Sequence, residues 1–359
     1  MLLQFSVETD LLIKDPQYKA HVERGQGFRL KQLHQNRVHT RNGLDLSSIQ
    51  HAIDWADNKL THGGALTAPN AIPEWVRSLY RNPSEAWEAQ KQWIQGIVSA
   101  LPQVKYWDVA NELWPTGVWM RNVPWAKQHH YWWIDESFHL AREANPNATL
   151  LIKELRPQDT SRWGVLLNYV SMARAKGVPI DGIAVQLHNQ CYHPLTISAI
   201  ETLLVRIKKL SGQFVAMGQE PLKILFDETI AWDTLVWSNK IAGGGYIQNL
   251  RRLFEPWQAA TYQGWRDLAE KYDVEVLGFW CPTDILEDTW HNSNRKFLFE
   301  GRDYWSVDAI RANPEAWKVW RSIPSDKRET PRKQKCTPGL WRTDWGAKPA
   351  LSVFPELVG

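Results

Sequence analysis

The sequence is poor in the features that mark several classes of protein. Its three cysteines, Cys191, Cys281 and Cys336, are too few and too widely spaced for a dense disulfide scaffold or a cysteine metal site, and only a single bridge stays open. No run approaches the roughly 18 uninterrupted apolar residues of a transmembrane helix. The formal net charge of +3 is small for 359 residues, so nothing favours a nucleic-acid or membrane partner.

The first residues lack the marks of an export signal. Met1 to Glu8 has neither the basic start nor the long apolar core of a signal peptide, and its pattern predicts a strand instead. The localisation stays open between secretion, if the sequence begins after a cleaved signal, and the cytoplasm. We expect a monomer that needs no cofactor and no metal.

Tryptophan is the residue that the sequence has in excess, with 22 in the chain. Its flat apolar face and single N–H donor suit both core packing and stacking on sugar rings. We expect most of these side chains to be structural and a few to line a binding site.

Short apolar or β-branched runs alternate along the chain with longer helical patterns, which is typical of βα units around a parallel sheet. Eight strands are expected, at residues 2–7, within 28–38, around 65–66, and at 104–110, 148–152, 180–187, 222–226 and 274–280. Helices are expected from about residue 15, at 46–60, 83–100, 124–144, 163–176 and 195–210, after 243–245, and at 314–323 and 347–354. The pattern predicts one (β/α)8 TIM barrel domain over residues 1–359.

The segment at about 290–339 is too long for an ordinary connection after a barrel strand. We expect it to be an insertion near the active-site face, where the strand C-termini meet. It contains many aromatic residues, namely Trp290, Phe297, Phe299, Tyr304, Trp305, Trp317 and Trp320. Two interpretations stay open: a lid that contributes sugar contacts, or a satellite core beside the barrel.

Two glutamates follow expected barrel strands. Glu112 comes after the fourth strand and Glu228 after the seventh, so both are expected at the C-terminal end of the barrel. Retaining glycosidases need one carboxyl that protonates the leaving oxygen and one carboxylate that attacks the anomeric carbon, about 5–5.5 Å apart. We therefore predict Glu112 and Glu228 as a catalytic pair.

Several motifs resemble those of glycoside hydrolase family 10, the endo-β-1,4-xylanase family. Residues 107–112, Trp-Asp-Val-Ala-Asn-Glu, are similar to its acid/base motif Trp-Asp-Val-Val-Asn-Glu. Residues 182–188 resemble its sixth-strand Gly-Ile-Gly-x-Gln-x-His, and residues 279–284 its eighth-strand Trp-Gly-Val-Thr-Asp. Residues 225–228 stand where the family has its nucleophile strand, so the resemblance implies that Glu112 is the general acid/base and Glu228 the nucleophile. The resemblance touches nearly the whole chain except the insertion.

The resemblance implies a role for several further residues. Asn111 is expected to hold the 2-hydroxyl of the sugar at the bond to be cleaved. His188 is expected to orient the nucleophile, with Gln186 supporting it, although a histidine of the core would explain His188 too. Trp280 is expected to wall the same sugar. Further substrate contacts are expected from Asn36 and from Trp290, which a core tryptophan would explain equally well.

The sequence also departs from the family pattern around the sugar. The third-strand His and Trp that touch the sugar in the family correspond to Gly64 and Ala68 here. A second-strand Lys and Trp are replaced by His39 and Thr40, and the nucleophile follows Asp227 where the family has Thr. Contacts away from the broken bond contribute to catalysis, so a changed substrate or a weak xylanase is expected.

The sequence thus predicts a retaining glycoside hydrolase that acts on xylan or a related polysaccharide. The alternative is a non-catalytic or weakly active carbohydrate-binding barrel, favoured by the lost pocket residues and opposed by the retained glutamates. We expect the two carboxyls about 5–6 Å apart, and His188 within hydrogen-bonding reach of Glu228.

Overall fold

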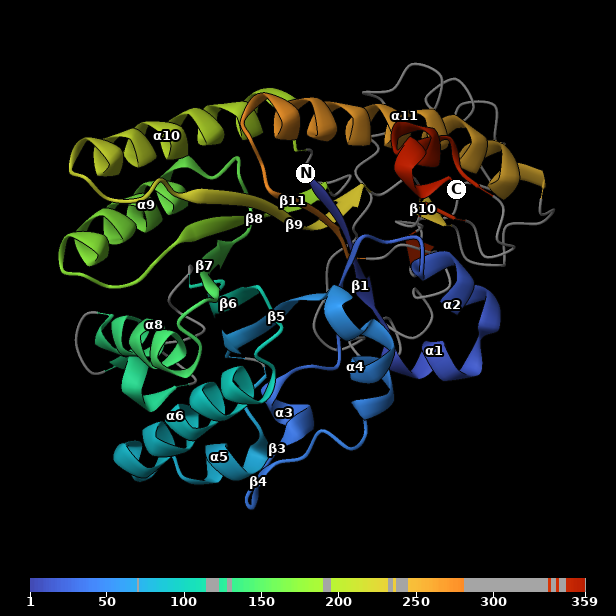
Figure 1. Cartoon of the computed structure of the whole chain (residues 1–359). Helices are drawn as coiled ribbons and strands as arrows, with labels where there is room; N and C mark the ends of the chain where they lie inside the picture. Colours follow the sequence, from blue (N-terminus) through green and yellow to red (C-terminus); the bar gives the residue numbers. More distant parts are fainter. Residues whose placement is uncertain are drawn as a thin grey trace, which may run out of the picture.

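The protein is described by a computed structural model that covers residues 1–69, 71–113, 123–127, 131–189, 195–231, 235–236, 245–280, 335–336, 340–341 and 347–358. Eight parallel strands close into a barrel, and helices surround it (Figure 1). Around the barrel the strands are β1 Leu2–Val7, β2 Gly27–Leu30, β5 Leu60–Thr67, β6 Tyr106–Asn111, β7 Thr149–Glu154, β8 Gly182–Asn189, β9 Lys223–Ala231 and β11 Val276–Phe279. The predicted TIM barrel is confirmed.

The helices follow the strands along the chain. They are α1 Thr9–Lys14, α2 Pro16–Val22, α3 Gln35–Val38, α4 Gln50–Ala56, α5 Glu74–Ser78, α6 Pro83–Ala100, α8 Trp132–Ala144, α9 Thr160–Ala175, α10 Ile197–Ala216 and α11 Gly245–Lys271. Short 3-10 turns lie at η1 Asp57–Lys59, η2 Pro124–Lys127, η4 Pro349–Val353 and η5 Pro355–Leu357. Two small antiparallel pairs join β3 His39–Thr40 to β4 Gly43–Leu44 and β10 Leu235–Val236 to β12 Lys335–Cys336.

Local sequence signals explain where these helices begin. Asp15 precedes Pro16, and its carboxylate accepts from the backbone N–H groups of Gln17 and Tyr18 at the start of α2.

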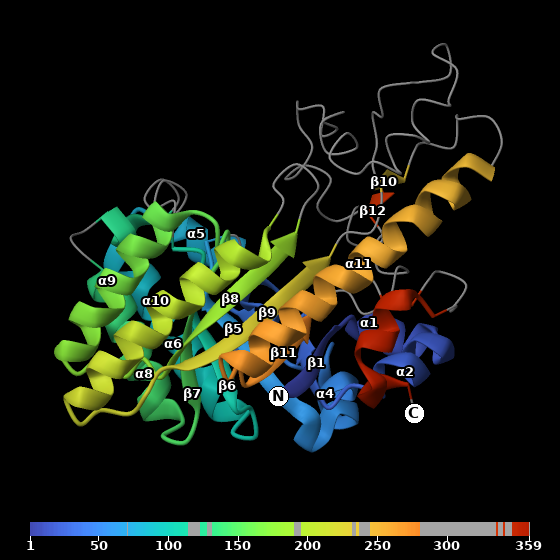
Figure 2. The ribbon, with the colours of Figure 1, turned by 90° about the horizontal axis from the view of Figure 1, so that it is seen from above.

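The C-terminal turns lie beside α11 in both views (Figures 1 and 2). There the Arg266 guanidinium donates to the Val353 carbonyl at 2.6 Å, which ties the end of the chain to the barrel.

Several boundaries differ from the predictions. The second strand ends at Leu30, because the chain turns at residues 31–34 before α3 begins at Gln35. The helix expected at 124–144 is divided into η2 and α8, and the one expected at 46–60 begins only at Gln50. The segment expected as a final helix forms η4 and η5, since prolines stand at 349 and 355 and remove backbone donors.

The predicted helix at 314–323, Trp290 and nearly all of the predicted insertion lie outside the described residues. Among the helices that the structure does describe, none is both long and apolar enough to cross a membrane.

The barrel interior begins with an apolar layer. One cluster joins buried side chains from five strands: Tyr106, Leu151, Ala184, Leu225 and Val276. Because side chains alternate along a strand, the residues two positions further on face the same interior. That next layer carries the site.

Candidate active site

The second layer of the barrel interior is polar and charged. Two positions after the apolar layer stand Asp108, Lys153, Gln186, Asp227 and Gly278, on β6, β7, β8, β9 and β11. The four side chains among them are buried. Each charged residue sits in a strand that is otherwise largely apolar, so the cost of its burial must be offset by partners inside the barrel.

A β-bulge in β9 brings Glu228 into this layer. Where β9 pairs with β8, Gln186 lies opposite Asp227 and His188 lies opposite Ile230. Over this stretch β9 therefore has one residue more than β8. Glu228 has a φ of 51°, in the left-handed region that L-residues enter at a cost of about 1–2 kcal/mol. In a regular strand Asp227 and Glu228 would face opposite sides. The bulge turns both carboxylates toward the same partners.

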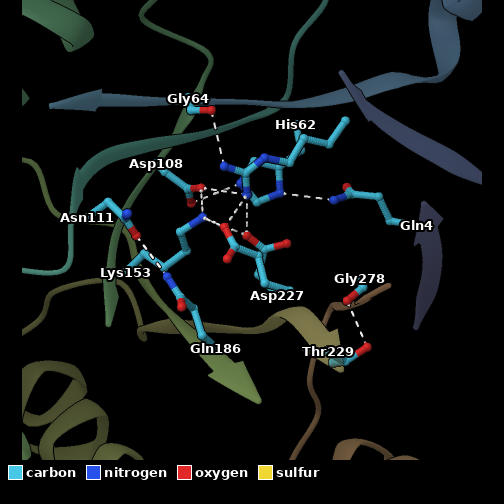
Figure 3. A network of polar contacts seen from close by, with 12 residues as sticks. Gln4, His62, Gly64, Asp108, Asn111, Lys153, Gln186, Asp227, Thr229 and Gly278 are labelled. Carbon is cyan, nitrogen blue, oxygen red and sulfur yellow. Dashed lines mark hydrogen bonds and ion pairs between the residues drawn. The ribbon is translucent and has the colours of Figure 1, made fainter. Parts of the chain in front are cut away.

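These partners form a buried ion cluster of Arg29, Asp108, Lys153, Asp227 and Glu228. The Lys153 Nζ lies 2.7 Å from Glu228 Oε1, 3.0 Å from Asp227 Oδ2 and 2.7 Å from Asp108 Oδ2. The Arg29 Nη1 lies 2.5 Å from Asp227 Oδ2, 3.0 Å from Asp108 Oδ2 and 3.5 Å from Glu228 Oε1. Figure 3 shows Lys153 pointing between Asp108 and Asp227. Every charge in the cluster thus faces an opposite charge.

The cluster holds its carboxyls ionised. Burial raises the pKa of Glu228, but the Lys153 ammonium, the His188 ring and Arg29 outweigh burial and bring this pKa well below its usual range. Burial likewise raises the pKa of Asp227, while Lys153 and Arg29 lower it further than burial raises it. Glu228 is therefore a carboxylate at neutral pH, the form that a nucleophile requires.

Glu112 lies at the end of β6 and is linked to the same neighbours. Its backbone also has a positive φ, 53°, and its N–H donates to the Lys153 carbonyl at 3.0 Å. The Gln186 amide donates to Glu112 Oε1 at 3.1 Å and to Asn111 Oδ1 at 3.0 Å, and Figure 3 shows Gln186 facing Asn111. The Gln186 NH2 group is thus directed to Asn111 and Glu112, and its predicted support of His188 stays a prediction.

The other predicted site residues lie at different distances from the cluster. His188 Nε2 is 3.5 Å from Glu228 Oε2, the outer limit of hydrogen bonding. Trp280 follows β11, and its ring lies 4.5 Å from the Lys31 ammonium and 5.7 Å from the Arg29 guanidinium carbon. Asn36 is exposed on α3, outside the buried ion cluster. The sugar contacts of Asn111, Trp280, Trp290 and Asn36 stay predictions.

Sequence reasoning missed the cationic half of the site. Arg29, Lys31 and Lys153 were not singled out, and neither was His34, which lies close enough to Arg29 for their charges to interact. Burial, followed by the charge of Arg29, lowers the pKa of His34 to about 4, so this ring is neutral at pH 7. A usable signal existed, since a lysine, Lys153, directly follows the apolar run 150–152.

Three side chains of the interior could suggest a metal. Ligand atoms of His62, Asp108 and Asp227 lie within 4.8 Å of one another. However, Lys153 and Arg29 already contact both carboxylates at 3.0 Å or less. A divalent ion at that point would face two buried cations, so the described residues offer no suitable metal site here.

Gly64 is required by the packing around the cluster. It has a φ of +109°, and a Cβ at this position would come within 2.7 Å of the Asp108 carbonyl oxygen. Its own carbonyl accepts from Arg29 Nη2 at 3.1 Å. The sugar-contacting His expected from the family pattern therefore has no room at this position unless the backbone shifts.

Gly64→Ala is expected to lower the free energy of unfolding by about 2–4 kcal/mol, because the methyl group meets backbone and the φ is strained. Urea denaturation followed by tryptophan fluorescence measures it. Gly212→Ala in α10 is the matched control, since a Cβ there meets nothing within 4 Å; it should be neutral or slightly stabilising. Equal stabilities of the two variants would contradict the prediction.

Comparison with known proteins relates the chain to xylanases and to one family of glycosyl hydrolases. A family model described as Glycosyl hydrolase family 10 matches residues 32–219. This range contains Glu112, Gln186 and His188 and ends before Glu228. Among curated proteins, the chain is similar to endo-1,4-beta-xylanase B of Thermotoga neapolitana, 25% identical over 48% of this chain and 51% of that protein. It is also 34% identical to a thermostable celloxylanase of Thermoclostridium stercorarium, over 50% of this chain and 44% of the relative.

The matches to curated proteins are partial. Endo-1,4-beta-xylanase A of Thermoanaerobacterium saccharolyticum is matched over 78% of this chain but only 23% of its own length. Solved structures share the fold along the whole chain: xylanase 10B of Thermotoga petrophila RKU-1, in complex with xylobiose, superposes with a TM-score of 0.70 at 19% identity, covering 100% of this chain and 94% of that one. The barrel fold of this chain is thus shared with a solved xylanase structure.

Proposed function

The chain belongs to glycosyl hydrolase family 10, and from this membership we propose that it is a retaining glycoside hydrolase that cleaves β-glycosidic bonds in xylan or a related polysaccharide. In the proposed double displacement, Glu228 attacks the anomeric carbon while Glu112 protonates the departing oxygen. Glu112 then takes a proton from water, which attacks the same carbon and releases Glu228. The relatives' names, xylanase and celloxylanase, support xylan as the substrate class.

One observation carries the proposal: two neighbouring strands each contact both glutamates. On β7, Lys153 accepts from the Glu112 N–H through its carbonyl and donates to Glu228 through its ammonium. On β8, Gln186 contacts Glu112 and His188 contacts Glu228. Residues two apart on a strand are roughly 6.6 Å apart. Both carboxyls therefore border the same short stretch, as a pair acting on one glycosidic bond requires.

The test is hydrolysis of β-1,4-xylan, β-glucans, mannans and aryl β-glycosides, with the first-formed anomer identified by proton NMR. Retention requires that the β-anomer appears first and mutarotates later. An α-anomer as first product would overturn the retaining mechanism. Binding of xylo-oligosaccharides without turnover on any substrate would support a non-catalytic carbohydrate-binding barrel instead, which Gly64 and Ala68 in the sugar wall would then explain.

Glu112→Gln is expected to lose about 10²–10⁴-fold in kcat on xylan, because the leaving oxygen is no longer protonated. On 2,4-dinitrophenyl β-xylobioside the first step should proceed at close to the parent rate, since dinitrophenolate leaves without a proton. Added azide should then restore turnover and give a β-xylobiosyl azide, detected by mass spectrometry. Full activity of this variant on xylan would rule out the acid/base assignment.

A further inference from the structure

Lys153 makes two hydrogen bonds, to Asp227 and Glu228, and an ion pair with Asp108 inside the barrel. An ammonium has three donors and no acceptor. Its Nζ lies within 3.0 Å of three carboxylates, those of Asp108, Asp227 and Glu228, and the side chain is fully buried. A lysine so fully engaged is held in one position. Burial and Arg29 lower its pKa, but the carboxylates, Asp108 first, raise it further, so Lys153 neither gives nor takes a proton near neutral pH.

The contacts distinguish the two oxygens of the nucleophile. Glu228 Oε1 accepts from Lys153 at 2.7 Å and lies 3.5 Å from Arg29 Nη1. Glu228 Oε2 lies 3.5 Å from His188 Nε2, and the His188 side chain is 27% exposed. Oε1 thus faces two buried cations, while Oε2 faces the partly exposed side of the site. Among the contacts of the described residues, those of Oε2 leave it the more accessible oxygen for a reacting carbon.

Asp227 complements this arrangement. Its Oδ2 contacts both Lys153 and Arg29, and Gly278 provides the space, since a Cβ there would lie 2.9 Å from Asp227 Oδ1. With Asp108 and Glu228, three carboxylates face the two cations. Removal of one cation alone would enlarge the excess of buried negative charge, which is unfavourable in a low-dielectric interior.

We propose that Lys153 is a positioning residue for the nucleophile: it anchors Glu228 Oε1 so that Oε2 attacks, and Asp227 balances the charge that this anchor introduces. The inference rests on the proposed glycosidase function. In the step, the Oε2–C1 bond forms, the bond from C1 to the leaving oxygen breaks, and the electron pair stays with that oxygen, which takes its proton from Glu112. Lys153 acts only through Glu228.

The pH dependence of this step should report the anchor. The groups that face Glu228 are Lys153 from β7, Arg29 from β2, Asp227 from β9, His188 from β8, and His34 ahead of α3. An opposite charge at this range lowers a carboxyl pKa by about 1–3. Lys153→Met should therefore raise the pKa of Glu228, so that protonation of the nucleophile begins at a higher pH.

The experiment measures covalent labelling of Glu228 by 2,4-dinitrophenyl 2-deoxy-2-fluoro-β-xylobioside, followed by intact mass as a function of pH. This leaving group needs no proton, so the acidic limb reports Glu228 and not Glu112. Lys153→Met should label at least about tenfold more slowly at pH 7, because the attacking oxygen is no longer held. Its acidic limb should move up by about 1–3 pH units.

The double variant Lys153→Met/Asp227→Asn removes one cation and one carboxylate together. Its acidic limb should return toward that of the parent, while its rate at pH 7 stays low because the anchor is still missing. This variant also decides the matter if Lys153→Met alone does not fold. Lys223→Met is the matched control, since Lys223 opens β9 at the far end of the barrel and is 38% exposed; it should label as the parent does.

The outcomes distinguish the positioning role of Lys153 from the proposed glycosidase function. Suppose that the parent protein is labelled, and that folded Lys153→Met and the double variant show the same labelling rate and the same acidic limb as the parent. This result overturns the positioning role alone. A parent protein that is labelled at no pH and hydrolyses none of the glycosides overturns the proposed function, and this inference with it. Slower labelling with a shifted limb that the double variant reverses supports the anchor.

Discussion

Glu228→Gln is expected to lower kcat on xylan and on aryl β-xylobiosides by about 10⁴-fold or more. The amide cannot attack the anomeric carbon, and it cannot offset the positive charge that develops there. Azide should give no rescue with retention, in contrast to Glu112→Gln. Steady-state kinetics on the dinitrophenyl glycoside, with intact mass to show that no glycosyl-enzyme accumulates, measures the effect.

The loss should be chemical and not structural. Without the Glu228 charge, Arg29 and Lys153 still face Asp108 and Asp227 at 3.0 Å or less, so the remaining cluster is balanced. The melting temperature should stay close to that of the parent. Glu275→Gln is the control. Glu275 stands directly before β11, its carboxylate accepts from the Tyr106 hydroxyl at 2.8 Å, and its side chain is 34% exposed. Its activity should be unchanged, and comparable losses in both variants would refute the nucleophile assignment.

The strands of the barrel could be predicted because their apolar runs are bounded by clear helical patterns. The prediction of Glu112 at the end of β6 held for the same reason, since β6 is buried from Tyr106 to Ala110 and half-buried at Asn111. The end of the seventh strand was wrong: β9 continues to Ala231. A glutamate looks like a strand terminator in the sequence, whereas here Lys153 and Arg29 compensate its burial within the barrel.

The cluster itself could be predicted only in part. The period of two places Asp108, Lys153 and Asp227 in one layer, and each charge stands out in its strand. The same period places Glu228 on the opposite face from Asp227. The bulge that reverses this depends on the left-handed φ of Glu228. Glycine is the residue type that usually adopts this conformation, so a glutamate at this position does not signal a bulge. The surrounding barrel imposes it, so local sequence gives no signal.

Arg29→Met is expected to lower the free energy of unfolding by about 3–5 kcal/mol, the cost of removing one partner from a buried ion pair. Arg29 contacts Asp108, Asp227 and the Gly64 carbonyl, and methionine fills part of its volume without donating to any of them. The carboxylates then share Lys153 as their only cation in the cluster. Urea denaturation at pH 7 gives the difference between parent and variant.

The difference should also depend on pH. Burial raises the pKa of Asp108, but the His62 ring, Lys153 and Arg29 lower it further than burial raises it, and the net pKa lies well below the usual value. A lowered carboxyl pKa contributes stability above the unfolded-state pKa, near pH 4, and loses it as the pH falls through the folded-state pKa. Without Arg29 the carboxyl pKa values rise. Protonation of these carboxyls then removes the unfavourable buried negative charge of the variant at a higher pH than in the parent. The difference in free energy of unfolding between parent and variant should therefore become smaller below about pH 4.

Arg77→Met provides the matched control for both parts of this prediction. Arg77 pairs with Glu74 at 3.6 Å on α5, where the two side chains are 44% and 87% exposed. An exposed pair of this kind contributes only about 0–1 kcal/mol, so its replacement should change stability little at any pH. If Arg29→Met were as mild as Arg77→Met, the buried ion cluster would not stabilise the barrel. A large loss that does not vary with pH would trace the effect to packing volume and not to charge.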